Sequence, residues 1–205
     1  MLAATLAAVV LAQQKPMFLY SREDWKAKPM VLQLEPHKID RITIHHTGVS
    51  QDFRRPFFEK LRGLQAWSQR EDKLDSGKSK PQWADIPYHY YIDCHGDIAE
   101  CRPIGFPGDT NTSYDVRGHA LVVVEGTLST EDFNDRQRQA LMETVLWLAA
   151  KYNVPADRIK GHMDYAPGET DCPGDKVMAF LPEIRKAVAK LHGIQGTIPG
   201  QRSSN

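Results

Sequence analysis

The chain has few cysteines, no excess of either charge and no apolar run long enough to cross a membrane. Three cysteines in 205 residues are too few for the disulfide framework that holds many small secreted domains together. Lysine plus arginine equals aspartate plus glutamate at 26 each, which excludes a strongly basic protein built for nucleic acid or anionic lipid. A membrane helix needs about 20 apolar residues, so no integral span is expected. We expect a globular protein whose substrate is uncharged or of mixed charge.

The first twelve residues, Met1–Ala12, are almost wholly apolar. Small residues in Val10–Ala12, followed by Gln13, resemble a signal-peptidase site, so we predict a cleaved signal peptide and a periplasmic or secreted protein. Because no lysine or arginine precedes Lys15, a misassigned start or an uncleaved anchor stays open as the alternative.

The rest of the chain is expected to form one domain over residues 13–192. No internal repeat is visible, and a chain with 41% hydrophobic residues can bury one sizeable core. Residues 193–205 are polar and are expected to form a disordered tail. We expect the protein to be a monomer.

Strand-like and helix-like segments alternate along this domain. Apolar residues recur at helical spacing in 57–69, after the capping pair Asn134 and Gln137, and in 175–191. The apolar run within 119–125 is typical of a strand buried on both faces. The pattern predicts an α/β fold, with a single mixed β-sheet flanked by helices.

Two stretches rich in polar and turn-forming residues predict loops. Residues 71–81 contain Lys, Asp, Ser and Gly without periodicity, so we expect a solvated loop whose charges have no specific role. Residues 105–113 are rich in Gly, Pro, Asp, Asn and Thr, which predicts a loop long enough to border a binding groove.

A β-hairpin is predicted between residues 88–94 and 97–102, turning at His95-Gly96. In that register Cys94 faces Asp97 and Cys101 faces Tyr90. The two cysteines are then too far apart for a relaxed disulfide, so no bridge is expected.

Three residues far apart in the sequence have the chemistry of one zinc site. His45 follows the buried-strand pattern Ile42–Ile44, His162 follows Gly161, and Cys172 lies in a loop with strong turn character. Two imidazoles and one thiolate leave the fourth tetrahedral position of zinc for water, as catalytic sites require. The softness of these ligands favours zinc over magnesium or calcium. The pattern therefore favours a metal hydrolase.

Taken singly, these residues have more ordinary explanations. With eight histidines in the chain, the His45-His46 pair is unremarkable on its own. Cys172 alone is more typically a small buried apolar side chain than a ligand. The metal interpretation depends on all three residues together.

Seven segments in order along residues 21–191 resemble one family. They are Ser21–Trp25, Ile42–Thr47, Leu61–Gln65, Trp83–Tyr90, Asp97–Pro103, Gly161-His162 and Asp171–Gly174. The chain resembles the zinc-dependent N-acetylmuramoyl-L-alanine amidases, which share a fold with the peptidoglycan recognition proteins of animals. Seven ordered matches are highly specific.

The resemblance implies that His45, His162 and Cys172 bind Zn²⁺, with His46 beside them in a supporting role. It places Tyr88 next to the water that reacts, where it would assist proton movement. Thr170 stands where some relatives carry lysine, and its hydroxyl would bind the oxyanion with a neutral hydrogen bond. The implied reaction is hydrolysis of the amide between N-acetylmuramic acid and L-alanine in peptidoglycan (murein) or in muropeptides.

Two other functions stay open. One is a peptidoglycan-binding module without activity, as in relatives that lack the cysteine ligand; the retained Cys172 argues against it. The other is a recycling amidase that acts on soluble anhydromuropeptides, which a cytoplasmic location would favour.

Other polar residues near these motifs have weaker claims. His119 is a candidate for substrate contact at the start of a strand. His89 is expected on the opposite strand face from Tyr88, as a packed or hydrogen-bonded histidine. Asp164 and Asp171 either orient His162 or the backbone, or face solvent. Of the remaining histidines, His95 is expected in the hairpin turn, and His37 and His192 are expected at the surface.

Overall fold

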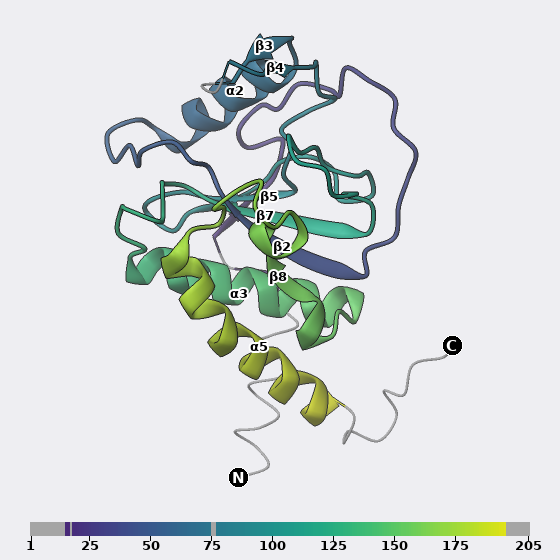
Figure 1. Ribbon diagram of the computed structural model, residues 1–205, viewed down its shortest axis with the longest axis vertical. Helices are drawn as coiled ribbons and strands as arrows, with labels where there is room; N and C mark the ends of the chain where they lie inside the picture. Colours follow the sequence, from purple (N-terminus) through teal and green to yellow (C-terminus); the bar gives the residue numbers. More distant parts are fainter. Residues whose placement is uncertain (1–14, 17, 75–76, 196–205) are drawn as a thin grey trace.

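The computed structural model describes residues 15–16, 18–74 and 77–195 (Figure 1). The predicted signal peptide, residues 1–12, and residues 196–205 of the predicted tail lie outside the described residues. None of the helices within the described ranges combines the length and the apolar character needed to cross a membrane.

Helices and strands alternate along the chain, as the sequence predicts. The elements are β1 (Leu19–Tyr20), β2 (Arg41–His46), α2 (Phe57–Ser68), β3 (Asp72–Lys73), β4 (Ser79–Lys80), β5 (Tyr90–Ile92), β6 (Ile98–Glu100), β7 (His119–Val124), α3 (Asp135–Tyr152), the 3-10 helix η1 (Ala156–Arg158), β8 (Ile159–Gly161), α4 (His162–Tyr165) and α5 (Asp175–Gln195). Asn134 caps α3 by accepting a hydrogen bond from the Gln137 amide at 3.0 Å, which confirms the predicted start of that helix.

A six-stranded sheet runs through the centre of the molecule in the order β1-β6-β5-β7-β2-β8. Strands β5 and β6 pair antiparallel, and the other neighbouring strands pair parallel. Helices α3 and α5 cover one face of this sheet, while α2 lies on the other side (Figure 1). The predicted mixed sheet flanked by helices is therefore confirmed.

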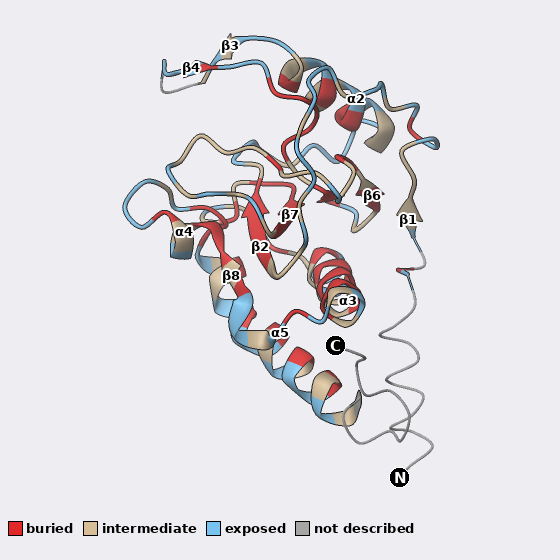
Figure 2. Ribbon diagram, turned by 90° about the vertical axis from the view of Figure 1, so that its right-hand side faces the viewer, coloured by how far each residue is buried: buried red, intermediate tan, exposed pale blue. Residues whose placement is uncertain are grey.

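The central strand β7 is buried on both faces (Figure 2), as its apolar run predicts. Ala120, Val122 and Val124 pack with α3 and α5 in the larger core cluster. Val123 points the other way and packs in a second cluster that includes Leu61 of α2. Because side chains alternate along a strand, the same rule applies to the neighbouring strand β2. Ile42 and Ile44 join the larger core, so His45 faces the opposite side of the sheet.

The predicted hairpin forms, but the predicted register is wrong by one residue. Tyr90 pairs with Glu100 rather than with Cys101. The turn holds three residues instead of two, since the Asp93 amide donates to the Asp97 carbonyl at 3.0 Å and Gly96 adopts φ 83°. A glycine in this left-handed conformation allows the extra residue in the turn. All three cysteines are free, as expected for Cys94 and Cys101.

Most described residues of the predicted solvated loop at 71–81 are exposed as expected, but the stretch contains the two-stranded sheet β3-β4, and one of its charges has a specific role. Lys80 is only 1% exposed and donates to three backbone carbonyls at 2.7 to 3.1 Å. Its ammonium lies 4.7 Å from the ring centre of Trp67 and 4.5 Å from that of Trp83. Cation–π contact and hydrogen bonds compensate the buried charge, a tertiary arrangement that the polar composition does not reveal.

The last helix begins at Asp175 as predicted but continues to Gln195, beyond the expected end at Leu191. Gly193 lies within it, since glycine lowers helix stability by only about 1 kcal/mol and does not by itself end a helix.

Candidate metal centre

The three predicted ligands meet at one cleft of about 540 Å³. His45 comes from β2, His162 is the first residue of α4, and Cys172 lies in the loop before α5. One ligand atom from each of them lies within 4.8 Å of the others. His45 Nδ1 lies 3.7 Å from Cys172 Sγ, and the two imidazole ring centres are 4.5 Å apart.

Parallel pairing of β2 and β8 brings the two histidines together. Ile44 pairs with Gly161, so His45, the next residue of β2, lies beside His162, which follows the last residue of β8. Gly161 is required at this point, because a Cβ there would lie 2.4 Å from the sulfur of Met178 and 2.8 Å from Cδ of Pro173. Any other residue before His162 would therefore displace Met178 or Pro173.

Cys172 is held by the backbone around it. Its amide donates to Thr170 Oγ1 at 3.1 Å, and its carbonyl accepts from the Met163 amide at 2.7 Å. The sulfur accepts a hydrogen bond from the His46 amide at 3.2 Å. Burial raises the pKa of the Cys172 thiol to about 12, although the His46 hydrogen bond lowers it. A nearby cation would favour the thiolate form of such a sulfur.

The donor set fits zinc. Burial lowers the pKa of His162 to about 4 and that of His45 well below its usual value, so both rings are neutral at pH 7. His162 Nδ1 is buried and has no hydrogen-bond partner, a cost that a bound cation would remove. Among the described residues this cluster contains no fourth donor, as is usual for a catalytic zinc site.

Tyr88 and Thr170 both line the same cleft. The Tyr88 ring centre is 5.2 Å from that of His45. Burial, followed by the charge of Cys172, raises the pKa of the Tyr88 phenol above its usual value. Both side chains are therefore close enough to the ligands for the predicted roles, which stay predictions.

The structure adds three site residues that the sequence analysis did not identify. Tyr114 Oη hydrogen-bonds with His45 Nε2 at 3.2 Å. Thr112 Oγ1 hydrogen-bonds with His162 Nε2 at 2.8 Å, and Thr110 Oγ1 lies 3.4 Å from the same nitrogen. Thr110 and Thr112 lie in the 105–113 loop, whose composition predicts that it borders a groove, whereas Tyr114 follows this loop. Without periodicity, nothing in it indicated which side chains turn inward.

His119 does not contact the cleft, so its candidate role in substrate contact is wrong. It is 1% exposed, and its Nδ1 hydrogen-bonds with Thr43 Oγ1 at 2.6 Å. The rings of Tyr114 and Tyr165 lie against it, with centre-to-centre distances of 5.1 and 4.7 Å. His119 is the first residue of the inner strand β7, and neighbouring residues cover its side chain.

His89 behaves as predicted. It is 1% exposed, its Nδ1 accepts from the Leu121 amide at 2.8 Å, and its Nε2 lies 2.9 Å from the Phe106 carbonyl. His46 also has a supporting role, since its Nδ1 accepts from the Leu128 amide at 3.2 Å.

Asp164 of α4 and Asp171 of the following loop form hydrogen bonds with groups other than the ligand rings. Asp164 accepts from the Gly161 amide at 3.0 Å, so it orients the backbone before His162 rather than its ring. Asp171 accepts from Ser129 Oγ at 3.0 Å. Neither is hydrogen-bonded to a ligand nitrogen in the described structure.

Of the remaining histidines, His95 lies in the turn as expected. His37 and His192 were predicted to be surface residues, and both are half-buried instead. His37 Nδ1 accepts from the Gly118 amide at 2.9 Å, and its Nε2 lies 3.1 Å from the Ile104 carbonyl. These backbone contacts join distant loops, which local sequence could not indicate.

Comparison with known proteins gives the fold and the family. Drosophila PGRP-LB is 24% identical, with 78% of this chain and 90% of that chain covered and a TM-score of 0.63. The ectodomain complex of PGRP-LCa and PGRP-LCx bound to tracheal cytotoxin shows 21% identity and a TM-score of 0.66. The match covers 82% of this chain and 96% of that chain. The amidase LysCS from Clostridium intestinale is 22% identical, with 80% of this chain and 90% of that chain covered and a TM-score of 0.56.

Identities this low show a shared fold, which is that of the peptidoglycan recognition proteins. None of the curated protein sequences matches the chain. The family model described as N-acetylmuramoyl-L-alanine amidase matches residues 35–175, which is more than half of the chain and includes all three candidate ligands. The chain therefore belongs to the N-acetylmuramoyl-L-alanine amidase family.

Proposed function

We propose that this protein is a zinc-dependent amidase that hydrolyses the bond between N-acetylmuramic acid and L-alanine in peptidoglycan. One observation carries the proposal: His45, His162 and Cys172 offer three ligand atoms within 4.8 Å of one another, on the wall of a cleft. Membership of the amidase family supports the substrate class and the reaction type.

Zinc in a site with three protein ligands acts as a Lewis acid and makes water nucleophilic at neutral pH. The neighbouring side chains must then place the substrate carbonyl and handle protons. Because burial raises the pKa of Tyr88, its phenol stays protonated at pH 7. It can donate a hydrogen bond to the oxygen of the substrate carbonyl, and it can accept a proton only if it passes its own proton to the leaving amine.

Thr170 is suited to bind the oxyanion. Its Oγ1 already accepts the Cys172 amide, so its own hydroxyl proton is available to donate towards the cleft. A neutral donor gives less stabilisation than a lysine ammonium would. The larger part of the oxyanion stabilisation is therefore assigned to the metal.

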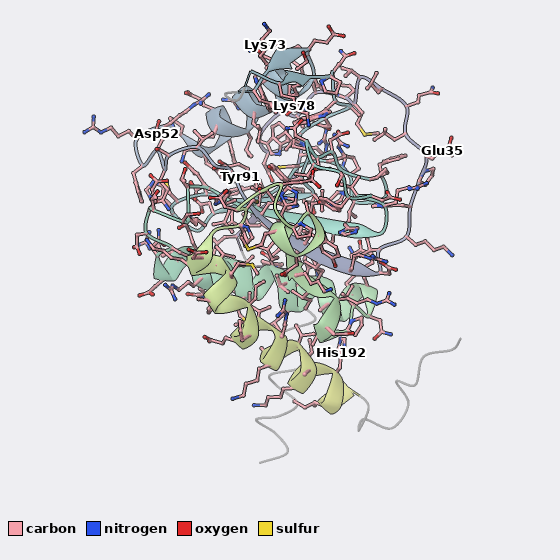
Figure 3. All side chains as sticks on the ribbon, viewed as in Figure 1. Glu35, Asp52, Lys73, Lys78, Tyr91 and His192 are labelled. Carbon is pink, nitrogen blue, oxygen red and sulfur yellow. The ribbon has the colours of Figure 1, made fainter. Side chains whose placement is uncertain are left out.

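The cleft suits a substrate of mixed charge. Its lining includes Lys78, Asp109 and Glu169 as well as Trp83 and Pro87. Lys78 belongs to the β3-β4 segment, at the end of the molecule away from α5 (Figure 3). A muropeptide combines neutral sugar, apolar methyl groups and carboxylates, which such a lining can accommodate.

Mass spectrometry of the products from purified murein tests the reaction. Wild type is expected to release free stem peptides with intact glycan strands, while Cys172→Ser releases none because a hydroxyl is a poor zinc ligand. Zinc content and thermal unfolding, measured on both proteins, separate loss of metal from loss of fold. Cleavage within the glycan by wild type would overturn the assignment.

A peptidoglycan-binding module without activity is the second candidate. It is favoured by the likeness to the complex of PGRP-LCa and PGRP-LCx, which has tracheal cytotoxin bound. Sedimentation with insoluble murein, without release of stem peptide at any zinc concentration, would support this function instead.

We further propose that the protein is exported and meets murein in the periplasm or outside the cell. The apolar segment Met1–Ala12 supports this. Cell fractionation and the mass of the mature N-terminus test it: a protein beginning near Gln13 is expected. A full-length cytoplasmic protein would favour the recycling amidase acting on soluble anhydromuropeptides.

A further inference from the structure

One short loop contacts both histidines of the candidate metal centre. Each imidazole has two nitrogens, and a metal uses only one of them. His45 Nδ1 faces Cys172 Sγ, and His162 Nδ1 is buried without a partner. On both rings the other nitrogen, Nε2, is engaged by a hydroxyl from the segment Thr110–Tyr114. Because these hydroxyls occupy Nε2 of both rings, Nδ1 is the nitrogen of each ring that is left to bind a metal.

The hydroxyls in this loop are fixed to one another. Thr110 Oγ1 and Thr112 Oγ1 are 2.8 Å apart, and the Thr112 amide donates to Thr110 Oγ1 at 3.2 Å. Tyr114 stacks on Tyr165 with ring centres 5.7 Å apart and an interplanar angle of 21°. The phenol and the threonine hydroxyls thus have little freedom to leave the histidine nitrogens.

The loop is also tied to the segment that carries two of the three ligands. The Ser113 amide donates to Glu169 Oε2 at 2.9 Å, and the Ser113 hydroxyl donates to the same carboxylate. Glu169 lies between His162 and Cys172 in the sequence. Movement of the loop would therefore disturb the ligand segment as well.

We propose that Thr112 and Tyr114 are positioning residues that set the tautomer and ring orientation of His162 and His45, and thereby the affinity of the site for zinc. With zinc on Nδ1, each Nε2 carries the proton and donates it to a hydroxyl oxygen. Partners of this kind contribute about 10- to 100-fold to metal affinity. Because both are neutral, they add no negative charge to a centre whose one anionic ligand is the Cys172 thiolate.

This inference rests on the zinc site of the proposed function. It is tested on the full chain, with zinc dissociation constants measured by competition against a chromophoric chelator. Thr112→Val and Tyr114→Phe remove a hydroxyl with little change of shape and are expected to weaken zinc binding about 10- to 100-fold. Thr112→Ser keeps the hydroxyl and is expected to restore binding close to wild type.

Tyr165→Phe is the matched control, because Tyr165 stacks on Tyr114 without a hydrogen bond to either ligand in the described structure. Thermal unfolding in chelator separates metal affinity from folding, since all variants should unfold near wild type without metal. The visible spectrum of the cobalt-substituted protein gives a second readout and should change in Thr112→Val but not in Thr112→Ser.

Two outcomes overturn the inference in distinguishable ways. If wild type binds zinc but Thr112→Val and Tyr114→Phe bind it equally well, the loop does not position the ligands. If wild type itself binds no zinc, the proposed metal-dependent function fails and this inference fails with it.

Discussion

Neutralisation of Lys60 is expected to lower the stability of the protein substantially. Lys60 lies on α2 and is 6% exposed. Its ammonium donates to the two carboxylate oxygens of Glu125 at 3.0 and 2.9 Å, and it lies 3.7 Å from Asp93 Oδ2. Glu125 and Asp93 are themselves 4% and 1% exposed. One cation therefore balances two buried carboxylates.

Lys60→Met keeps the length of the side chain but leaves both carboxylates uncompensated. Breaking a buried ion pair by removing one partner costs about 3–5 kcal/mol. Asp93 Oδ2 has no hydrogen bond of its own, so little replaces the lost charge. Glu125 also accepts the amides of Asp52 at 2.9 Å and Cys94 at 3.1 Å, so the loop after β2 should loosen too.

The cost should depend on pH in a defined direction. Burial raises the pKa of the Asp93 carboxyl above its usual value, and Lys60→Met removes the lysine charge that lowers it, so this pKa rises further in the folded variant. The folded variant then binds more protons than the unfolded chain, so its stability falls as pH rises. The penalty of Lys60→Met is expected to be largest at pH 7 and smaller at pH 5.

Urea unfolding of the metal-free protein at both pH values measures this. Lys190→Met, at an exposed position on α5, should cost less than about 0.5 kcal/mol. The double variant Lys60→Met/Glu125→Gln should recover part of the loss, because it removes one uncompensated charge. A cost below about 1 kcal/mol at pH 7, or one that is equal at pH 5, would refute the reasoning.

Three further predictions concern metal, pH and packing. Removal of zinc with a chelator should stop release of stem peptide, and added zinc should restore it; activity that persists in chelator would contradict the metal role. Burial lowers the pKa of His89 to about 3 and of His119 to about 4. Both bind protons in the unfolded chain below about pH 6.5, so the stability of the metal-free protein should fall as pH drops from 6.5, with His119 contributing about 3 kcal/mol by pH 4. Urea midpoints that are unchanged between pH 6.5 and 5 would contradict this. Gly161→Ala should cost about 1–3 kcal/mol and weaken zinc binding, because its Cβ would meet Pro173 at 2.8 Å, whereas Gly193→Ala, with nothing within 4 Å, should not destabilise the protein.

The alternation of the elements was predictable because it depends on local periodicity. The run of β-branched residues before His45, the buried strand β7 and the Asn134 cap all follow from side-chain geometry within a few residues. The hairpin register was not predictable, since one left-handed glycine, Gly96, added a residue to the turn and shifted every pair. The order of the six strands likewise depends on which non-local faces can be buried together.

The burial of two lysine side chains was also not predictable from the sequence. Lysine side chains are usually exposed to solvent, yet those of Lys60 and Lys80 are almost completely buried. Their partners are a carboxylate 65 residues away and a pair of tryptophan rings, respectively. Only a tertiary arrangement supplies such compensation, so lysine content in a segment does not establish that it is solvated.

The sequence by itself determined the chemistry of the candidate site, because two imidazoles and a sulfur are a zinc-like donor set wherever the chain brings them together. The tertiary structure decided how those donors face one another: the pairing of β2 with β8 joins the histidines, and the hydroxyls of Thr112 and Tyr114 select the nitrogen that each presents. The physical reason is that donor identity belongs to single residues, whereas ring orientation depends on hydrogen bonds between segments about 50 to 70 residues apart.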